Sequence, residues 1–229
     1  RYDVHAILRD DLKIGNVNKK INKMIKKKIK EFIPFSVRFW VRKIQNKIFG
    51  TEREYRNMSH TQIFDKIYSN KTWGETYNGQ STSGDGSHLT YIIQPYINKV
   101  NSFLSETKPS SIVDLGCGDF NIGKNFAPFT HKYIASDVSS VILERNKSEY
   151  SDFNNVNFVL IDITKNNLPK ADVGFIRQVL QHLSNQSIKK FVTYVNQHKP
   201  FKHLLVTEHL SNSNTFRENI DKPTGSGIR

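Results

Sequence analysis

The sequence predicts an α/β fold in which a doubly wound parallel sheet carries helices on both faces. Three observations support this prediction. An apolar run that begins at Ile112 leads directly into a glycine-rich turn, Gly116-Cys117-Gly118. Further short apolar runs follow along the chain, and several of them end in an acidic residue. Longer stretches with helical spacing alternate with these runs, which is the pattern of a parallel sheet built from strand–helix–strand units.

The predicted elements follow one another in a regular order. Short apolar runs of about four to eight residues fit strands, and longer amphipathic stretches fit helices. After the run that begins at Ile112, strands are expected at 132–137, 156–161, 172–176 and 203–207. Helices are expected at 91–105, 121–129, 139–150 and 185–198.

The glycine turn after the first strand is suited to a closely bound ligand. Gly116 and Gly118 have no side chains, so the backbone can approach the ligand and adopt unusual dihedral angles. Asp114 and Asp119 make the turn acidic, which suits a cationic nucleoside better than a pyrophosphate. Cys117 between the glycines is expected to be a small apolar packing residue beneath the ligand, with a nucleophilic role as the alternative.

Acidic residues also end the second and third strands. Asp137 lies 21 residues after Gly116, about where an acidic residue holds the ribose hydroxyls in a doubly wound nucleotide-binding fold. Asp162 follows the third strand. Each aspartate could instead cap a helix, but the three acids in this order favour a nucleoside site. A dinucleotide fingerprint would need a third glycine where Asn121 stands, so it is not matched.

The octet Ile-Val-Asp-Leu-Gly-Cys-Gly-Asp at 112–119 resembles motif I of the class I S-adenosylmethionine (SAM) dependent methyltransferases, whose usual form is V-D-L-G-C-G. The resemblance implies a Rossmann-like methyltransferase sheet, S-adenosyl-L-methionine as the cofactor and S-adenosylhomocysteine as the product. It also implies that Asp162 contacts the adenine amino group. Together, the residues assigned to cofactor binding are Trp73, Ser83, Gly84, Ser87, Asp114, Gly116, Cys117, Gly118, Asp119, Asp137, Val138, Asp162, Ile163, Arg177 and Gln178.

A narrower resemblance covers residues 60–229. Three segments carry it in order along the chain. Residues 64–74 contain an Ile-Tyr pair and a Trp-Gly pair, and residues 81–88 contain Ser-Gly-Asp-Gly-Ser. The third segment, at 177–184, reads Arg-Gln-Val-Leu-Gln-His-Leu-Ser. This combination resembles bacterial methyltransferases associated with cell-surface polysaccharide and sugar biosynthesis. The hydroxyl-rich loop 81–87 could close over the methionine end of the cofactor, or it could be an ordinary surface loop.

Catalysis of methyl transfer needs little from the protein, because the sulfonium already activates the methyl group and orientation supplies most of the rate. A sugar hydroxyl benefits from a general base, and histidine is the natural candidate. His182 after the fourth strand, and His209 with Glu208 after the fifth, are the predicted catalytic residues; His88 lies on the loop. A divalent ion on His182, Glu208, His209 and Asp221 is an alternative that the spacing does not support, so no metal is predicted.

The positive charge of the chain is concentrated near its N-terminus. Between Lys19 and Lys47 there are eleven lysines and arginines and one acidic residue, which accounts for about +10 of the net charge of +13. Apolar residues at helical spacing accompany them, so residues 1–59 are predicted to form a basic amphipathic helical appendage to the domain at 60–229. Residues 19–49 could bind an anionic membrane surface, pack on the domain, or hold nucleic acid, which is the least favoured of the three.

The sequence after the fifth strand is too short to complete the sheet of a class I methyltransferase. Only 21 residues follow Glu208, and they are mostly polar, so strands six and seven are expected to be missing. The single cysteine excludes a disulfide framework and fits a cytoplasmic protein, with a peripheral position at the inner face of the membrane as an extension of the basic appendage.

These observations predict a SAM-dependent methyltransferase that acts on a hydroxyl of a small-molecule or glycan acceptor, namely a sugar, nucleotide-sugar or glycolipid of surface-polysaccharide synthesis. An RNA methyltransferase that uses the basic segment to hold phosphates is the alternative enzyme. A non-catalytic SAM-binding scaffold at the membrane is the alternative outside the enzymes.

Overall fold

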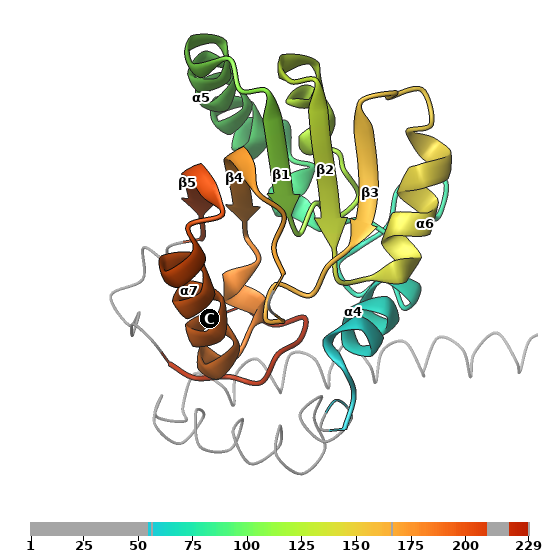
Figure 1. Cartoon of the computed structure of the whole chain (residues 1–229). Coiled ribbons are helices and arrows are strands. Elements are labelled where there is room, and N and C mark those ends of the chain that lie inside the picture. The colour runs from blue at the N-terminus through green and yellow to red at the C-terminus, as the bar shows by residue number, and fades with distance from the viewer. Residues whose placement is uncertain (1–54, 56, 166, 210–219, 229) are drawn as a thin grey trace, which may run out of the picture. The chain divides into compact units, whose positions relative to one another are not determined.

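The computed structural model describes residues 55, 57–165, 167–209 and 220–228 (Figure 1). The predicted basic segment 19–49, and with it nearly all of the predicted appendage, lies outside these residues. Tyr55–Arg229 form one compact unit. Tyr55 is itself buried in its core.

The described unit is built on a five-stranded parallel sheet with the order β3-β2-β1-β4-β5. The sequence runs from the centre to one edge and then returns to the other side of β1, so the loops after β1 and β4 leave the sheet in opposite directions. Ligands of open α/β sheets bind in the crevice at such a switch point. The strands are β1 (Ser111–Leu115), β2 (Lys132–Asp137), β3 (Val156–Leu160), β4 (Ala171–Arg177) and β5 (Phe201–Thr207).

Among the described residues, four longer helices accompany the sheet, and serine side chains start three of them. Ser59 forms a capping box with Gln62, while Ser139 and Ser184 each accept a hydrogen bond from a backbone amide of the first turn. The helices are α4 (His60–Ser69), α5 (Thr90–Thr107), α6 (Ser140–Glu149) and α7 (Asn185–His198). The predicted helices at 91–105, 139–150 and 185–198 are confirmed to within two residues at either end.

The predicted helix at 121–129 is wrong. The structure has two single 3₁₀ turns there, Gly123–Asn125 and Ala127–Phe129. Pro128 has no amide hydrogen and disfavours helical geometry in the residue before it, so it disfavours a continuous α-helix in this segment. Gly123 is also required, because a Cβ atom at this position would lie 2.5 Å from the Phe120 ring and 2.9 Å from a carboxylate oxygen of Asp114.

Two apolar layers lie on opposite faces of the sheet. Alternate residues of β1 point to opposite faces, so Ile112 packs in the layer that contains Leu104 of α5, while Val113 packs with Ile67 of α4 and Phe191 of α7. Figure 1 shows α5 and α7 beside different parts of the sheet, consistent with these two layers. The predicted doubly wound fold with helices on both faces is therefore confirmed.

The edge strands of the described sheet are β3 and β5. Leu160 on β3 and Val206 on β5 are each about half exposed. The prediction that strands six and seven are missing stays a prediction, because residues 210–219 and 229 lie outside the described part of the chain.

Leu104→Ala should destabilise the domain by about 2–5 kcal/mol, since Leu104 is fully buried and its truncation leaves a cavity between α5 and the sheet. Urea denaturation followed by circular dichroism measures this free energy. Val192→Ala on α7 is the matched control, because Val192 is 43% exposed and should change stability by less than about 0.5 kcal/mol. Equal losses in the two variants would contradict the described packing.

Candidate active site

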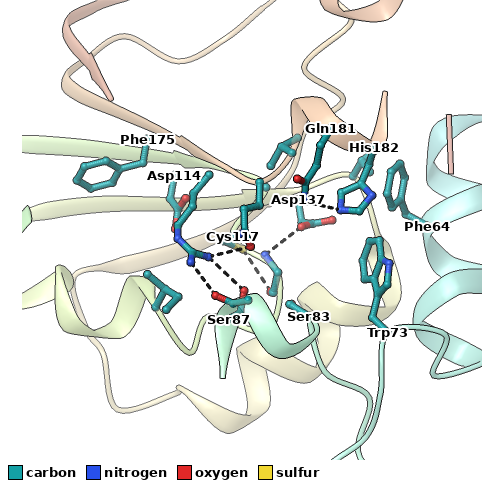
Figure 2. Close-up of a pocket in the computed structure, with 18 of the residues that line it drawn as sticks. Phe64, Trp73, Ser83, Ser87, Asp114, Cys117, Asp137, Phe175, Gln181 and His182 are labelled. Carbon is teal, nitrogen blue, oxygen red and sulfur yellow. Dashed lines mark hydrogen bonds between the residues drawn. The ribbon is translucent and has the colours of Figure 1, made fainter. Parts of the chain in front are cut away.

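A cavity of about 400 Å³ opens at the carboxyl ends of the central strands (Figure 2). Its wall combines the turns that follow the strands, the loop 81–88, one face of α4 and the segment 226–228. Fifteen of the predicted site residues line it: Trp73, Ser83, Ser87, Asp114, Gly116, Cys117, Gly118, Asp137, Val138, Asp162, Ile163, Arg177, Gln178, His182 and His209. The other three predicted residues, Gly84, Asp119 and Glu208, do not line the cavity.

The glycine turn after β1 has left-handed backbone geometry at both glycines, with φ of +84° at Gly116 and +55° at Gly118. A side chain at either position would also collide with a neighbour. At Gly116 the added atom would meet the side chain of Val179, and at Gly118 it would meet the hydroxyl of Ser83. The glycines therefore allow two other segments to pack against the turn, in addition to allowing a ligand to approach it.

Two buried carboxyl groups face the cavity beside this turn. Burial raises the pKa of Asp114 to about 7, although a hydrogen bond from the Tyr133 hydroxyl at 3.0 Å opposes the shift. Burial also raises the pKa of Asp137 to about 6, against hydrogen bonds from the amides of Gly118 at 3.0 Å and Ser139 at 2.9 Å. Two carboxyl groups held in this way favour a positively charged ligand, which would lower both pKa values.

Arg177 provides a positive charge in the same cavity. Its Nη2 atom donates to the carbonyl of Gly86 at 2.7 Å, and its guanidinium lies 5.0 Å from the centre of the Tyr96 ring. Its Nη1 atom donates to the hydroxyl of Ser87 at 3.4 Å. The Nε atom is buried and has no hydrogen-bond partner among the described residues. A buried donor without a partner is unfavourable in free energy, so we expect a bound ligand to provide an acceptor for this atom.

The loop 81–88 is docked on the glycine turn through Asp119. The carboxylate of Asp119 accepts a hydrogen bond from the amide of Ser83 at 2.8 Å and lies 2.6 Å from Nε2 of His88. The amide of Asp119 donates to the Ser83 hydroxyl at 2.9 Å. Hydrogen bonding to Asp119 raises the pKa of His88. Asp119 thus holds the loop in place, and Ser83, Gly86 and Ser87 of the loop line the cavity.

The predicted adenine contact, Asp162, is already engaged by two side chains. His60 at the start of α4 places Nδ1 3.2 Å from one carboxylate oxygen, and the Thr164 hydroxyl donates to the other at 2.7 Å. Burial acts to raise the pKa of Asp162, but these hydrogen bonds outweigh it and lower the pKa to about 2. His60 also lines the cavity and was missed by sequence reasoning, because no local pattern links residues 102 positions apart.

His182 is held on two sides. Its ring lies 4.9 Å from the Trp73 ring, and its Nδ1 atom lies 3.2 Å from the carbonyl oxygen of Gly227. Trp73 in turn donates to the carbonyl of Ser226 at 3.1 Å. Burial lowers the pKa of His182 to about 4, assisted by the charge of Lys222. The segment 226–228 is therefore part of the site wall, although its sequence, Ser-Gly-Ile, gave no signal of this.

Glu208 and His209 follow β5 but lie in different places. His209 lines the cavity. The carboxylate of Glu208 accepts hydrogen bonds from the amides of Val179 at 3.1 Å, Leu180 at 2.8 Å and Gln181 at 3.3 Å. Glu208 thereby fixes the turn that carries His182. Within the described residues, no three His, Cys, Asp or Glu side chains come together in a group that could hold a metal ion.

Comparison with known proteins supports the interpretation that this geometry suggests. Residues 112–198, which include the glycine turn, Asp137, Asp162 and the turn with His182, match the family model of a methyltransferase domain. This part of the chain is therefore similar to a methyltransferase domain. No curated protein sequence matches the chain.

Several solved methyltransferase structures are similar to part of the chain. The methyltransferase domain of bacterial CtHen1 has 18% identity and a TM-score of 0.46, covering 49% of this chain and 64% of that one. A SAM-dependent methyltransferase from Clostridium acetobutylicum has 18% identity and a TM-score of 0.42, covering 52% and 50%. The N-methyltransferase NodS from Bradyrhizobium japonicum, in complex with S-adenosylhomocysteine, has 16% identity and a TM-score of 0.41, covering 49% and 62%. The chain thus spans less than two thirds of each of these structures.

The residues of the cavity fit SAM. Arg177, with its unsatisfied Nε atom, suits the methionine carboxylate, and Asp114 suits the methionine ammonium group. Asp137 suits the ribose hydroxyls. A volume of about 400 Å³ lies within the range of small-molecule sites. When bound, the cofactor supplies an electrophilic methyl group on a positively charged sulfur atom.

The affinity for S-adenosylhomocysteine should rise with pH between about 5 and 8. Asp114, with a pKa of about 7, and Asp137, with a pKa of about 6, are partly protonated in this pH range, whereas the ammonium group of the ligand favours their ionised forms. Binding therefore requires proton release at low pH and none above both pKa values. Calorimetry at a series of pH values measures this dependence.

Asp114→Asn should lower the affinity at pH 8 by roughly 10- to 100-fold, the loss of one charged hydrogen bond, and should remove the part of the pH dependence nearest pH 7. Asp152→Asn, at an exposed position, is the matched control and should change neither quantity. An unchanged pH dependence in the Asp114 variant would contradict the assignment.

Proposed function

We propose that the described unit is a SAM-dependent methyltransferase domain that transfers the methyl group of SAM to a hydroxyl of a sugar, nucleotide-sugar or glycolipid, as in surface-polysaccharide synthesis. The observation that carries the proposal is the neutral imidazole of His182 in the cavity wall, packed against Trp73. With a pKa of about 4, His182 is unprotonated at neutral pH and is available as a weak base.

A weak base is sufficient for methylation of a hydroxyl. The oxygen lone pair attacks the methyl carbon, and the O–H proton becomes strongly acidic as the new O–C bond forms. A neutral imidazole near the nucleophile can accept that proton. General acid–base catalysis of this kind typically increases the rate by about 10²- to 10⁴-fold. The other requirement is orientation, which the surrounding wall supplies.

The wall around His182 suits a sugar ring. Trp73 contacts Phe64, Tyr68 and His182, with ring centres 5.9, 5.3 and 4.9 Å apart, so the cavity has a continuous aromatic side. Figure 2 shows Phe64, Trp73 and His182 grouped at one side of the cavity. Aromatic faces pack against the C–H face of a sugar, and neutral polar side chains such as Gln178 and Gln181 can bind hydroxyls.

Label from methyl-labelled SAM should be transferred to a sugar when nucleotide-sugars, lipid-linked sugars, RNA and small amines are compared as acceptors. His182→Ala should lower turnover by roughly 10²- to 10⁴-fold, with affinity for S-adenosylhomocysteine kept within about threefold, because the histidine acts on the acceptor. His198→Ala, at the exposed end of α7, is the matched control. Transfer to RNA alone would identify an RNA methyltransferase, and cofactor binding without any transfer would favour a scaffold.

We also propose that the basic segment 19–49 brings the domain to an anionic membrane, where a lipid-linked acceptor would lie. The support is its sequence, which combines about +10 net charge with apolar residues at helical spacing. No helix among the described residues has the length and apolarity needed to cross a membrane.

Full-length protein should co-sediment with vesicles that contain anionic lipid, and binding should weaken without vanishing as salt rises, because apolar contact is insensitive to salt. Replacing Lys26, Lys27, Lys28 and Lys30 by Gln should reduce binding strongly, since each lysine contributes about 1 kcal/mol near such a surface. Replacing the four domain lysines Lys147, Lys165, Lys189 and Lys190 is the charge-matched control. Equal reductions in the two proteins would exclude the segment as the binding element.

A further inference from the structure

The hydrogen bonds around His182 fix the orientation of the neighbouring amide of Gln181. The carbonyl oxygen of Gly227, 3.2 Å from Nδ1, can only accept a hydrogen bond, so Nδ1 carries the single proton of the neutral ring. The Nε2 atom therefore presents a lone pair. The Nε2 atom of Gln181 lies 3.3 Å from it, so the amide group of Gln181 turns its NH₂ to the histidine.

This orientation leaves the carbonyl oxygen of the Gln181 side chain without a partner in the described part of the chain. Gln181 is 8% exposed and lines the cavity, and its Oε1 atom is buried with no hydrogen-bond donor among the described residues. The backbone amide of Gln181 is also held, through its hydrogen bond to Glu208. A fixed, buried acceptor without a donor is costly, which indicates that a ligand supplies the donor.

The position of Gln181 points to the methyl acceptor as that ligand. Arg177 and Asp114 suit the methionine end of the cofactor, and Asp137 suits its ribose, so the sulfonium that joins the two parts would lie between them. Gln181 enters from the turn after β4, and Figure 2 shows its side chain turned toward the part of the cavity that Asp137 faces. The cofactor ends thus have their own partners, while the Oε1 atom is left for a molecule that approaches the methyl group.

We propose that Gln181 is an acceptor-binding residue, whose Oε1 atom accepts a hydrogen bond from the hydroxyl that becomes methylated. This inference rests on the proposed transfer to a hydroxyl group. In the reaction the oxygen forms a bond to the methyl carbon, the carbon–sulfur bond breaks, and its electron pair stays on sulfur. The hydroxyl proton passes to Nε2 of His182, where it replaces the weak hydrogen bond from Gln181, and then to water.

Gln181→Cys tests the position without an identified acceptor. A thiolate there would attack the methyl carbon of SAM, the carbon–sulfur bond of the sulfonium would break with its electron pair kept on sulfur, and the thiol proton would pass to water. Incubation with methyl-labelled SAM should therefore label the peptide that contains position 181, as detected by mass spectrometry. Cys117 is an internal control, because it is present in every variant and its labelling would report methylation that does not depend on position 181.

Gln181→Met keeps the size of the side chain and removes the hydrogen-bond acceptor. Its affinity for S-adenosylhomocysteine should stay within about threefold of wild type, because the lost partner belongs to the acceptor and not to the cofactor. A loss of about tenfold or more would assign Oε1 to the cofactor and overturn the proposal. The Gln181→Cys variant could also bind S-adenosylhomocysteine and yet remain unlabelled. This result would place position 181 away from the methyl group and would likewise overturn the proposal.

These outcomes are independent of whether the natural acceptor is a sugar. The introduced thiol is its own nucleophile, so labelling at position 181 with no transfer to any sugar would refute the sugar assignment and keep the role of Gln181. Transfer to a sugar with no labelling at position 181 would refute the role of Gln181 alone. Val192→Cys, at an exposed position on α7, controls for non-enzymatic methylation by SAM.

Discussion

The site depends on a steric constraint at the turn after β1, where two residues have to be without side chains. The space that a side chain of Gly116 would take is filled by Val179 from the turn after β4, and the corresponding space at Gly118 is filled by Ser83 from the loop 81–88. Three segments distant in the sequence therefore meet at one turn. Because Val179 leads directly to Gln181 and His182, the same contact sets the position of the proposed acceptor-binding side of the cavity.

Charge inside the cavity is arranged in a way that the cofactor would complete. Asp114 and Asp137 are buried at a cost that raises their pKa values, and the Nε atom of Arg177 is buried with no hydrogen-bond partner among the described residues. The ammonium and carboxylate groups of SAM would pair with Asp114 and Arg177, and its ribose hydroxyls would pair with Asp137. These pairings would favour SAM over a nucleoside that lacks the amino-acid part.

Most features that depend on neighbouring residues could be predicted from the sequence, whereas a contact between residues far apart along the chain was missed. The helix at 185–198 was predicted with its correct ends, since Ser184 caps it locally and its apolar spacing is regular. The prediction of a helix at 121–129 was wrong. The apolar residues of this segment suggested a helix, but Gly123 and Pro128 favour the two 3₁₀ turns that are present. The glycine turn and the strand-terminal aspartates were located from their spacing along the chain. His60 was missed because its partner Asp162 is distant in sequence.

The sequence by itself determined the doubly wound sheet and the acidic glycine turn, since these depend on periodicity and on residue types at fixed short spacing, and its motifs predicted SAM as the cofactor. Only the tertiary structure decided which functional groups are free to act. In the tertiary structure Asp119 docks a loop, Glu208 caps a turn and Nδ1 of His182 is hydrogen bonded to Gly227, whereas Oε1 of Gln181 has no donor among the described residues. The physical reason is that hydrogen-bond satisfaction depends on partners brought together from across the whole fold.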